Sequence, residues 1–273
     1  MTDSRLPRLL KPEALEKQFN SEGLVIIDLS RDKTHAQGHI AGARHLDYGK
    51  IVRAEKPVMG LLPTAEQFSE ALSSVGVTAD DHIVAYDDEG GGKAARLLWT
   101  LECFGHTRYA LLNGGLHAWA NEGHALTTEA SSFAPSDYQL PPVAGCEATV
   151  RGDFILEHLN DENVALLDAR SPQEFTGEKR YAERGGRIPG AVNIEWTTLM
   201  DQGRNLRLKP EDELRALLGE KGFTSDKTII VYCQTHHRSA HTWFVLNYLG
   251  YTARGYEGSW SDWGNQADTP IEV

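Results

Sequence analysis

The sequence IIVYCQTHHRS, residues 229–239, places a cysteine between a predicted strand and a predicted helix. The β-branched run 229–232 is typical of a parallel strand buried on both faces. The apolar pattern that follows predicts a helix over 238–249, which ends at Gly250 as helices commonly end at glycine. Open parallel sheets bind ligands where a strand ends and a helix begins. Cys233 is therefore the first candidate for a functional residue.

The same signatures occur earlier in the chain in the same order, which indicates an internal repeat. They are an apolar run ending in Asp, a glycine-rich turn, a second apolar run before a loop and helix, and a short segment ending in Trp. The two copies match at 24–28 and 164–168, 38–43 and 186–191, 83–87 and 229–233, and 113–119 and 257–263.

This repeat predicts the fold class and the domain organisation. Each copy is expected to form a three-layer α/β domain, with a mostly parallel sheet and helices on both faces. The helices include 93–104 and 238–249, and others that start near Thr64 and Pro210. The stretch from 129 to 149 has little periodicity and carries Ser131-Ser132, Pro135 and Pro141-Pro142, which is typical of a linker. We expect an N-terminal domain at 1–130, a linker at 131–148 and a C-terminal domain at 149–273.

Composition excludes several classes of protein. The formal net charge of -12 argues against nucleic acid or an anionic membrane as the partner, since both require clustered Lys and Arg. No apolar run reaches the roughly 20 residues that cross a bilayer, and the first residues lack an apolar signal core. We therefore expect a soluble, cytoplasmic monomer.

The three cysteines, Cys103, Cys146 and Cys233, are widely spaced and fit neither a disulfide framework nor a zinc site. Cys103 and Cys146 are expected to be small buried apolar residues. Around Cys233, loop amides and the helix N-terminus should stabilise a thiolate, lower its pKa and leave the sulfur exposed for attack. The other residues expected to bind substrate are Gln234, Thr235, His236, His237, Arg238 and Ser239.

His236 and His237 are expected to line the mouth of the site and to add positive potential when protonated. Adjacent side chains diverge and no third ligand is near in sequence, so we expect no metal there and no cofactor. In the first copy, Asp87 takes the place of Cys233 and the loop that follows, 88–92, is acidic and lacks a nucleophile. That loop should repel anions.

Taken together, these ordered signatures resemble those of tandem rhodanese sulfurtransferases over nearly the whole chain. The CQTHHR loop at 233–238 looks most like that of the Azotobacter-type bacterial thiosulfate sulfurtransferases. The resemblance implies a non-catalytic N-terminal copy and a persulfide on Cys233. It also implies thiosulfate as the small anionic sulfur donor, and cyanide or a thiol as the acceptor, with 3-mercaptopyruvate as the alternative donor.

One departure concerns anion binding. The resemblance implies that vertebrate thiosulfate enzymes and mercaptopyruvate enzymes of this family bind substrate with an arginine at the position that Glu174 occupies here. Arg238 becomes the expected anion ligand instead, because its planar fork suits sulfonate oxygens. Arg170 is expected to pair locally as a scaffold residue. Trp196 either walls the site or fills core.

Two rival interpretations remain open. Cysteine-dependent phosphatases also hold their substrate in a loop that ends in arginine, but with C-x5-R spacing, whereas Cys233 and Arg238 have C-x4-R spacing. The shorter loop favours a bare sulfur over a tetrahedral phosphate. A non-catalytic sulfur carrier or interaction module is the other rival, and the presence of Cys233 counts against a purely non-catalytic module.

Overall fold

The computed structural model describes residues 6–140 and 145–273, and they form two compact units. The first unit takes in the described parts of 1–52, 63–146 and 201–208, and the second takes in 53–62, 147–200 and 209–273. Segments 53–62 and 201–208 thus belong to the unit built mainly from the other half of the sequence. The described linker residues 131–140 and 145–148 contain no helix or strand. Residues 141–144 lie outside the described part.

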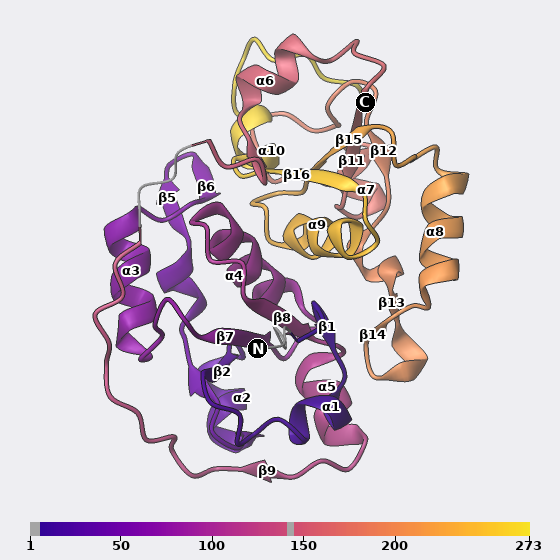
Figure 1. Ribbon diagram of the computed structural model, residues 1–273. Coiled ribbons are helices and arrows are strands. Elements are labelled where there is room, and N and C mark those ends of the chain that lie inside the picture. The colour runs from indigo at the N-terminus through magenta and orange to yellow at the C-terminus, as the bar shows by residue number, and fades with distance from the viewer. Residues whose placement is uncertain (1–5, 141–144) are drawn as a thin grey trace. The chain divides into compact units, whose positions relative to one another are not determined.

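Both units contain a five-stranded parallel sheet with the same strand order (Figure 1). The predicted tandem α/β fold is therefore confirmed. In the first sheet the order is β1 (Leu9–Leu10), β8 (Tyr109–Leu112), β7 (His82–Tyr86), β2 (Leu24–Asp28) and β4 (Arg44–His45). In the second it is β10 (Thr149–Val150), β16 (Thr252–Tyr256), β15 (Thr228–Tyr232), β11 (Val164–Asp168) and β12 (Val192–Asn193).

Helices cover both faces of each sheet because alternate strand residues point to opposite sides. In the second unit, Leu166, Ile230 and Tyr256 pack with Trp260 and Trp263 on one face, while helix α9 packs against β15 and β16 on the other. In the first unit the helices are α1 (Pro12–Glu16), α2 (Asp32–Gln37), α3 (Ala65–Ser74), α4 (Gly92–Cys103) and α5 (Gly115–Asn121). In the second they are α6 (Gly152–Glu157), α7 (Pro172–Phe175), α8 (Glu211–Glu220), α9 (Arg238–Tyr248) and α10 (Ser259–Trp263).

The predicted helices lie where the capping signals place them. Thr64 accepts a hydrogen bond from the amide of Gln67, whose side chain in turn accepts from the Thr64 amide, so α3 begins with a capping box. Pro210 precedes α8, as predicted. The helices α4 and α9 end within one residue of the predicted 104 and 249, and Gly105 and Gly250 follow with φ near +80°.

The remaining elements are short. A hairpin of β5 (Arg53–Glu55) and β6 (Val58–Leu61) belongs to the second unit, and β3 (His39–Ile40) pairs with β9 (Leu126–Thr127) in the first. The others are β13 (Met200–Asp201), β14 (Arg207–Leu208) and the 3-10 turns η1 (Tyr48–Ile51), η2 (Trp196–Leu199) and η3 (Gln202–Arg204). No helix in the described ranges combines the length and apolar character that spanning a membrane requires.

Candidate active site

Cys233 follows the last residue of β15, and α9 begins five residues later at Arg238. The loop between them turns sharply, with His236 in the left-handed region at φ +52°. Such a conformation is uncommon for a residue with a side chain. It lets the loop curl back over its own start. The predicted exposure of the sulfur is wrong for this conformation, because Cys233 is fully buried by the loop that surrounds it.

The surroundings of Cys233 favour its ionised form. Burial alone raises the pKa of the thiol, but the positive charge of Arg238 and hydrogen bonds to sulfur act in the opposite direction. The donors are the hydroxyl and amide of Ser239 and the amide of Thr235. Their combined effect outweighs desolvation, so the pKa of Cys233 lies below its ordinary value.

This lowered pKa predicts the pH dependence of Cys233 alkylation. The thiolate is the reactive species, so the folded protein should keep reacting with iodoacetamide at pH values where an ordinary cysteine is protonated. The rate should fall as the pH drops through the lowered pKa. Peptide mapping after timed alkylation measures the midpoint, with the chain unfolded in urea as the reference. A folded midpoint at or above that of the unfolded chain would contradict the predicted stabilisation.

Arg238 forms a bidentate ion pair that the sequence analysis did not anticipate. Its Nη1 lies 2.6 Å from Glu174 Oε2, and its Nη2 lies 2.8 Å from Glu174 Oε1. Burial raises the pKa of Glu174, but the pairing with Arg238 more than offsets this, and the pKa falls below its usual value. The side chain of Glu174 is also fixed by Ser171, with which it forms the capping box of α7. Glu174 thus orients Arg238. Its position is the one where vertebrate thiosulfate enzymes and mercaptopyruvate enzymes are expected to carry an arginine.

The other predicted loop residues differ in their surroundings. Gln234, Thr235 and His237 are half-buried, and the Gln234 side chain donates to the carbonyl of Tyr181. The prediction that His236 lines the mouth of the site is wrong, because its side chain is fully buried and its Nδ1 lies 2.7 Å from the Ser239 hydroxyl. The positive-φ turn at His236 directs the imidazole inward instead of toward solvent. His237 lies with its ring edge-on to Trp196.

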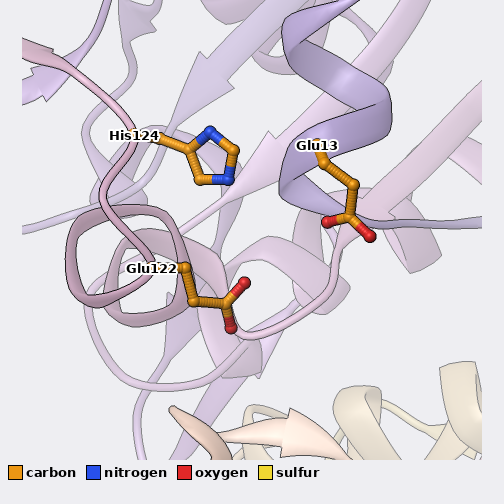
Figure 2. Close-up of side chains that lie close together, drawn as sticks. All are labelled: Glu13, Glu122 and His124. Carbon is orange, nitrogen blue, oxygen red and sulfur yellow. The ribbon is translucent and has the colours of Figure 1, made fainter.

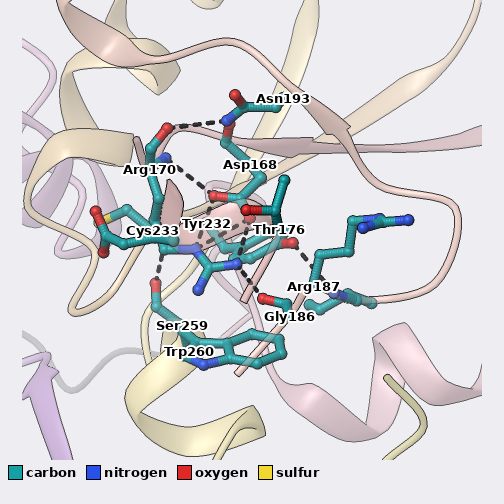
Figure 3. A network of polar contacts seen from close by, with 12 residues as sticks. Asp168, Arg170, Thr176, Gly186, Arg187, Asn193, Tyr232, Cys233, Ser259 and Trp260 are labelled. Atoms are coloured by element: carbon teal, nitrogen blue, oxygen red, sulfur yellow. Dashed lines mark hydrogen bonds and ion pairs between the residues drawn. The ribbon is translucent and has the colours of Figure 1, made fainter. Parts of the chain in front are cut away.

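Ser259, which was not among the site residues predicted from the sequence, is hydrogen-bonded to the backbone of the Cys233 loop. The Ser259 hydroxyl accepts a hydrogen bond from the amide of Cys233 at 3.3 Å (Figure 3). It also accepts one from the amide of His236 at 3.1 Å, and it donates to the carbonyl of Tyr256 at 2.8 Å. Ser259 has φ +51°, the same value as Gly115 at the matching position of the first copy. The sequence repeat therefore contained a signal for Ser259: a serine occupies a position of positive φ at which the other copy has glycine.

Arg170 forms a buried ion pair with Asp168, which confirms the local pairing predicted for it. Its guanidinium donates to both carboxylate oxygens of Asp168 and to the carbonyl of Gly186, and it lies 4.4 Å from the Trp260 ring centroid (Figure 3). Arg170 is 1 % exposed and Asp168 is fully buried. The pair joins the end of β11 to α10, whose amides support the loop.

Trp196 lies within the second unit beside α9. Its ring is edge-on to the imidazole of His241, with the centroids 5.5 Å apart, and to that of His237 at 6.4 Å. It is half-buried, whereas His241 is fully buried. Trp196 therefore packs against His237 of the Cys233 loop and His241 of α9, and it is not a fully buried core residue.

The matching loop in the first copy encloses an acidic side chain of its own. The Asp87 carboxylate is fully buried and accepts hydrogen bonds from the amides of Glu89, Gly91 and Ala94 at 2.8 to 3.0 Å. Burial still raises the pKa of Asp87. Asp88, the next residue, pairs with Arg31 and Lys93. The Glu89 amide, which matches the Thr235 amide of the second copy, thus faces a side-chain carboxyl group here instead of sulfur.

The two remaining cysteines have different environments. Cys103 is buried in α4, as predicted. The predicted burial of Cys146 is wrong, because it is half-buried in a segment of the described linker that forms no helix or strand. Neither residue lies in a strand-to-helix loop.

A possible metal site in the first unit is blocked by an arginine. In the described part of the chain, one group of three potential ligands comes together, Glu13, Glu122 and His124, with ligand atoms within 4.8 Å of one another (Figure 2). Arg207 forms ion pairs with both Glu13 and Glu122. Its hydrogen bonds and charge help to lower the pKa of both carboxyl groups. The acidic groups therefore already have a cationic partner.

Comparison with known proteins identifies the family. The Rhodanese-like domain matches residues 11–122 and again 153–266. A thiosulfate sulfurtransferase from Azotobacter vinelandii is 42 % identical, over 98 % of both chains, and one from Pseudomonas aeruginosa is 40 % identical, over 99 % of this chain and 98 % of the relative. The sulfur carrier protein TtuD of Thermus thermophilus is 38 % identical, over 96 % of this chain and 95 % of that protein.

A solved structure supports the fold independently. The anaerobic ergothioneine biosynthesis enzyme from Chlorobium limicola superposes with a TM-score of 0.84 at 23 % identity, covering 97 % of this chain and 70 % of that one. At that identity the likeness concerns the fold alone. The duplicated domain match and the full-length relatives show that this chain belongs to the rhodanese family, with two rhodanese-like domains in tandem.

Proposed function

We propose that this protein is a thiosulfate sulfurtransferase in which Cys233 carries the transferred sulfur as a persulfide. The observation that carries the proposal is the environment of Cys233, whose thiolate is favoured by Arg238, by Ser239 and by the Thr235 amide. The thiosulfate sulfurtransferases that share 40 to 42 % of its sequence support thiosulfate as the donor. An ionised sulfur in a polar cradle is a nucleophile for sulfur transfer.

The reaction has two displacements. The Cys233 thiolate attacks the outer sulfur of thiosulfate, the sulfur–sulfur bond of the donor breaks, and its electron pair leaves with sulfite. The enzyme then holds a Cys–S–S⁻ persulfide. Cyanide attacks the outer sulfur to give thiocyanate, or a thiolate attacks it to give an acceptor persulfide, and the Cys233 thiolate is regenerated. Ping-pong kinetics follow from this scheme.

We assign different roles in this reaction to the residues of the loop. The Thr235 and Ser239 amides and the Ser239 hydroxyl stabilise first the thiolate and then the persulfide anion. A guanidinium has five N–H donors, of which Glu174 accepts two. We assign other N–H groups of Arg238 to the sulfite oxygens of the donor, and the half-buried Gln234 and His237 to its approach. His236 acts as a buried support for Ser239.

Access to the sulfur requires movement. Cys233 has no exposed surface, so a donor reaches it only after neighbouring side chains shift. The residues that we expect to shift are the half-buried ones of the loop, which include Arg238, because His236 is fully buried.

The proposal includes a cytoplasmic monomer. All three cysteines lie in the described part of the chain and none is in a disulfide, which fits a reducing compartment.

The test is the covalent intermediate. Incubation with excess thiosulfate should add one sulfur atom to the intact protein mass, and cyanide should remove it with release of thiocyanate. The same experiment with 3-mercaptopyruvate ranks the two donors. If the protein gains no sulfur from either donor but hydrolyses an aryl phosphate, the C-x4-R argument fails and the phosphatase interpretation replaces this one.

A sulfur carrier is the second candidate, and the TtuD relative is the observation that favours it. A carrier and an enzyme both form the persulfide, but only the enzyme turns over many times. Multiple turnovers with thiosulfate and a small acceptor support the enzyme. Stoichiometric loading that is discharged only by a protein acceptor supports the carrier.

A further inference from the structure

The hairpin of β5 and β6 contacts the Cys233 loop through strand β6. Gly60 lies in the left-handed region, at φ +74°, and packs directly on Thr235. A Cβ added at Gly60 would lie 2.1 Å from the Thr235 carbonyl oxygen and 2.9 Å from the Thr235 Cβ, far inside contact distance. Only glycine fits between the hairpin and the loop. The hairpin and the loop belong to the same compact unit, although they come from different halves of the sequence.

Hydrogen bonds on either side of this contact join the hairpin segment to α10 and to Glu257, just before that helix. The Met59 amide donates to the Ser261 hydroxyl at 3.0 Å, and that hydroxyl lies 3.2 Å from the Met59 carbonyl. The Leu62 amide donates to Glu257 Oε2 at 2.7 Å. Buried or half-buried backbone groups rarely go without partners. Here the partners come from the segment that supports the loop.

The α10 segment is also hydrogen-bonded to the loop that carries the Cys233 sulfur. The amide of Ser261 donates to the carbonyl of Gln234 at 2.9 Å, and the amide of Trp260 donates to that of Cys233 at 3.0 Å. The Thr235 amide in turn is one of the groups that stabilise the Cys233 thiolate. Thr235 therefore contacts the hairpin through its carbonyl oxygen, and its amide faces the sulfur.

We propose that Met59 and Gly60, on strand β6 of the hairpin, form a positioning element of the sulfur-transfer site, which holds Thr235 in the orientation that Cys233 requires. Neither residue touches the sulfur, so both act through Thr235 and Ser261. This assigns a catalytic task to a segment from the sequence copy that has no nucleophile. The enzymatic part of the inference rests on the proposed function.

The main test compares two glycine substitutions with nearly the same backbone conformation. Gly60→Ala and Gly190→Ala both place a side chain at positive φ, +74° and +76°, but nothing lies within 4 Å of a Cβ at Gly190. The backbone strain is thus matched, and only Gly60→Ala pushes on Thr235. We expect Gly60→Ala to lower kcat/KM for thiosulfate by on the order of 10²-fold, the scale for a misplaced reactive group. Gly190→Ala should stay within about twofold, as substitutions without a contact do.

A second readout does not depend on sulfur transfer. The midpoint of the pH profile for Cys233 alkylation should rise in Gly60→Ala, because the displaced Thr235 amide no longer stabilises the thiolate, and should be unchanged in Gly190→Ala. A merely structural contact would lower the melting temperature without moving this midpoint. Equal midpoints and equal kcat/KM in the two variants would overturn the proposal. If the wild type transfers no sulfur, the midpoint still tests the positioning while the proposed function fails.

Ser261→Ala keeps the inference testable if Gly60→Ala does not fold. It removes the hydroxyl that binds the Met59 backbone without adding an atom. We expect a smaller rise of the alkylation midpoint and a loss of about tenfold in kcat/KM, the effect of one hydrogen bond of ordinary strength. Wild-type values for both quantities in folded Ser261→Ala would overturn the link between hairpin and sulfur.

Discussion

Cys233→Ser is expected to abolish sulfur uptake from thiosulfate and to reduce thiosulfate:cyanide activity by more than about 10³-fold, as removal of a nucleophile does. A serine hydroxyl is not ionised near neutral pH, so the cradle that favours the thiolate has no anion to stabilise. The substitution is close to isosteric and leaves the Ser259 contacts to the loop amides in place. The fold should therefore persist, which circular dichroism and the melting temperature check. Intact mass after thiosulfate treatment gives the direct readout.

The other two cysteines supply the controls. Cys146→Ser changes a half-buried thiol, and Cys103→Ala removes a buried one from α4 without burying a hydroxyl. Both variants should take up one sulfur atom and retain activity, apart from a modest loss of stability in Cys103→Ala. A folded Cys146→Ser or Cys103→Ala that loses activity as completely as Cys233→Ser contradicts the assignment of the persulfide to Cys233.

The parts of this fold that sequence predicted are those set by local patterns. The runs ending in Asp28 and Asp168, and those before Asp87 and Cys233, mark parallel strands because β-branched residues recur there between helical patterns. Repetition of the same order in both halves then fixed two equivalent sheets, which the strand orders confirm. The stabilisation of the Cys233 thiolate was likewise predictable, since a loop between a parallel strand and a helix points its amides inward.

The parts that sequence did not predict depend on contacts between distant residues. Glu174 and Arg238 are separated by 64 positions, and nothing in their local sequence indicates that they pair. The contact between Gly60 and Thr235 joins the two halves of the sequence, and it depends on a hairpin that lies outside the signatures that define the sequence repeat. The burial of Cys233 and His236 follows from the positive φ of His236, a conformation that a histidine rarely adopts. Packing decided each of these features, and local preference did not.

Arg238→Ala should produce the second large loss of activity. Arg238 is the largest of the charge and hydrogen-bond contributions that lower the pKa of Cys233, and it is the proposed ligand of the departing sulfite. Removing it should raise the pKa of Cys233 and lower kcat/KM for thiosulfate by about 2 to 4 kcal/mol in transition-state terms, the scale for a charge-assisted contact. Steady-state kinetics against thiosulfate and the alkylation midpoint measure the two effects.

The same substitution leaves Glu174 as a buried carboxylate without its cationic partner, so Arg238→Ala should also destabilise the fold by about 2 kcal/mol. Adding Glu174→Gln separates the two consequences, because the amide keeps the shape of the side chain and removes its charge. We expect the double variant to recover most of the lost unfolding free energy in urea titrations and little of the lost kcat/KM. Recovery of both would show that Arg238 serves only to neutralise Glu174, and the donor would then be bound by the loop amides without it.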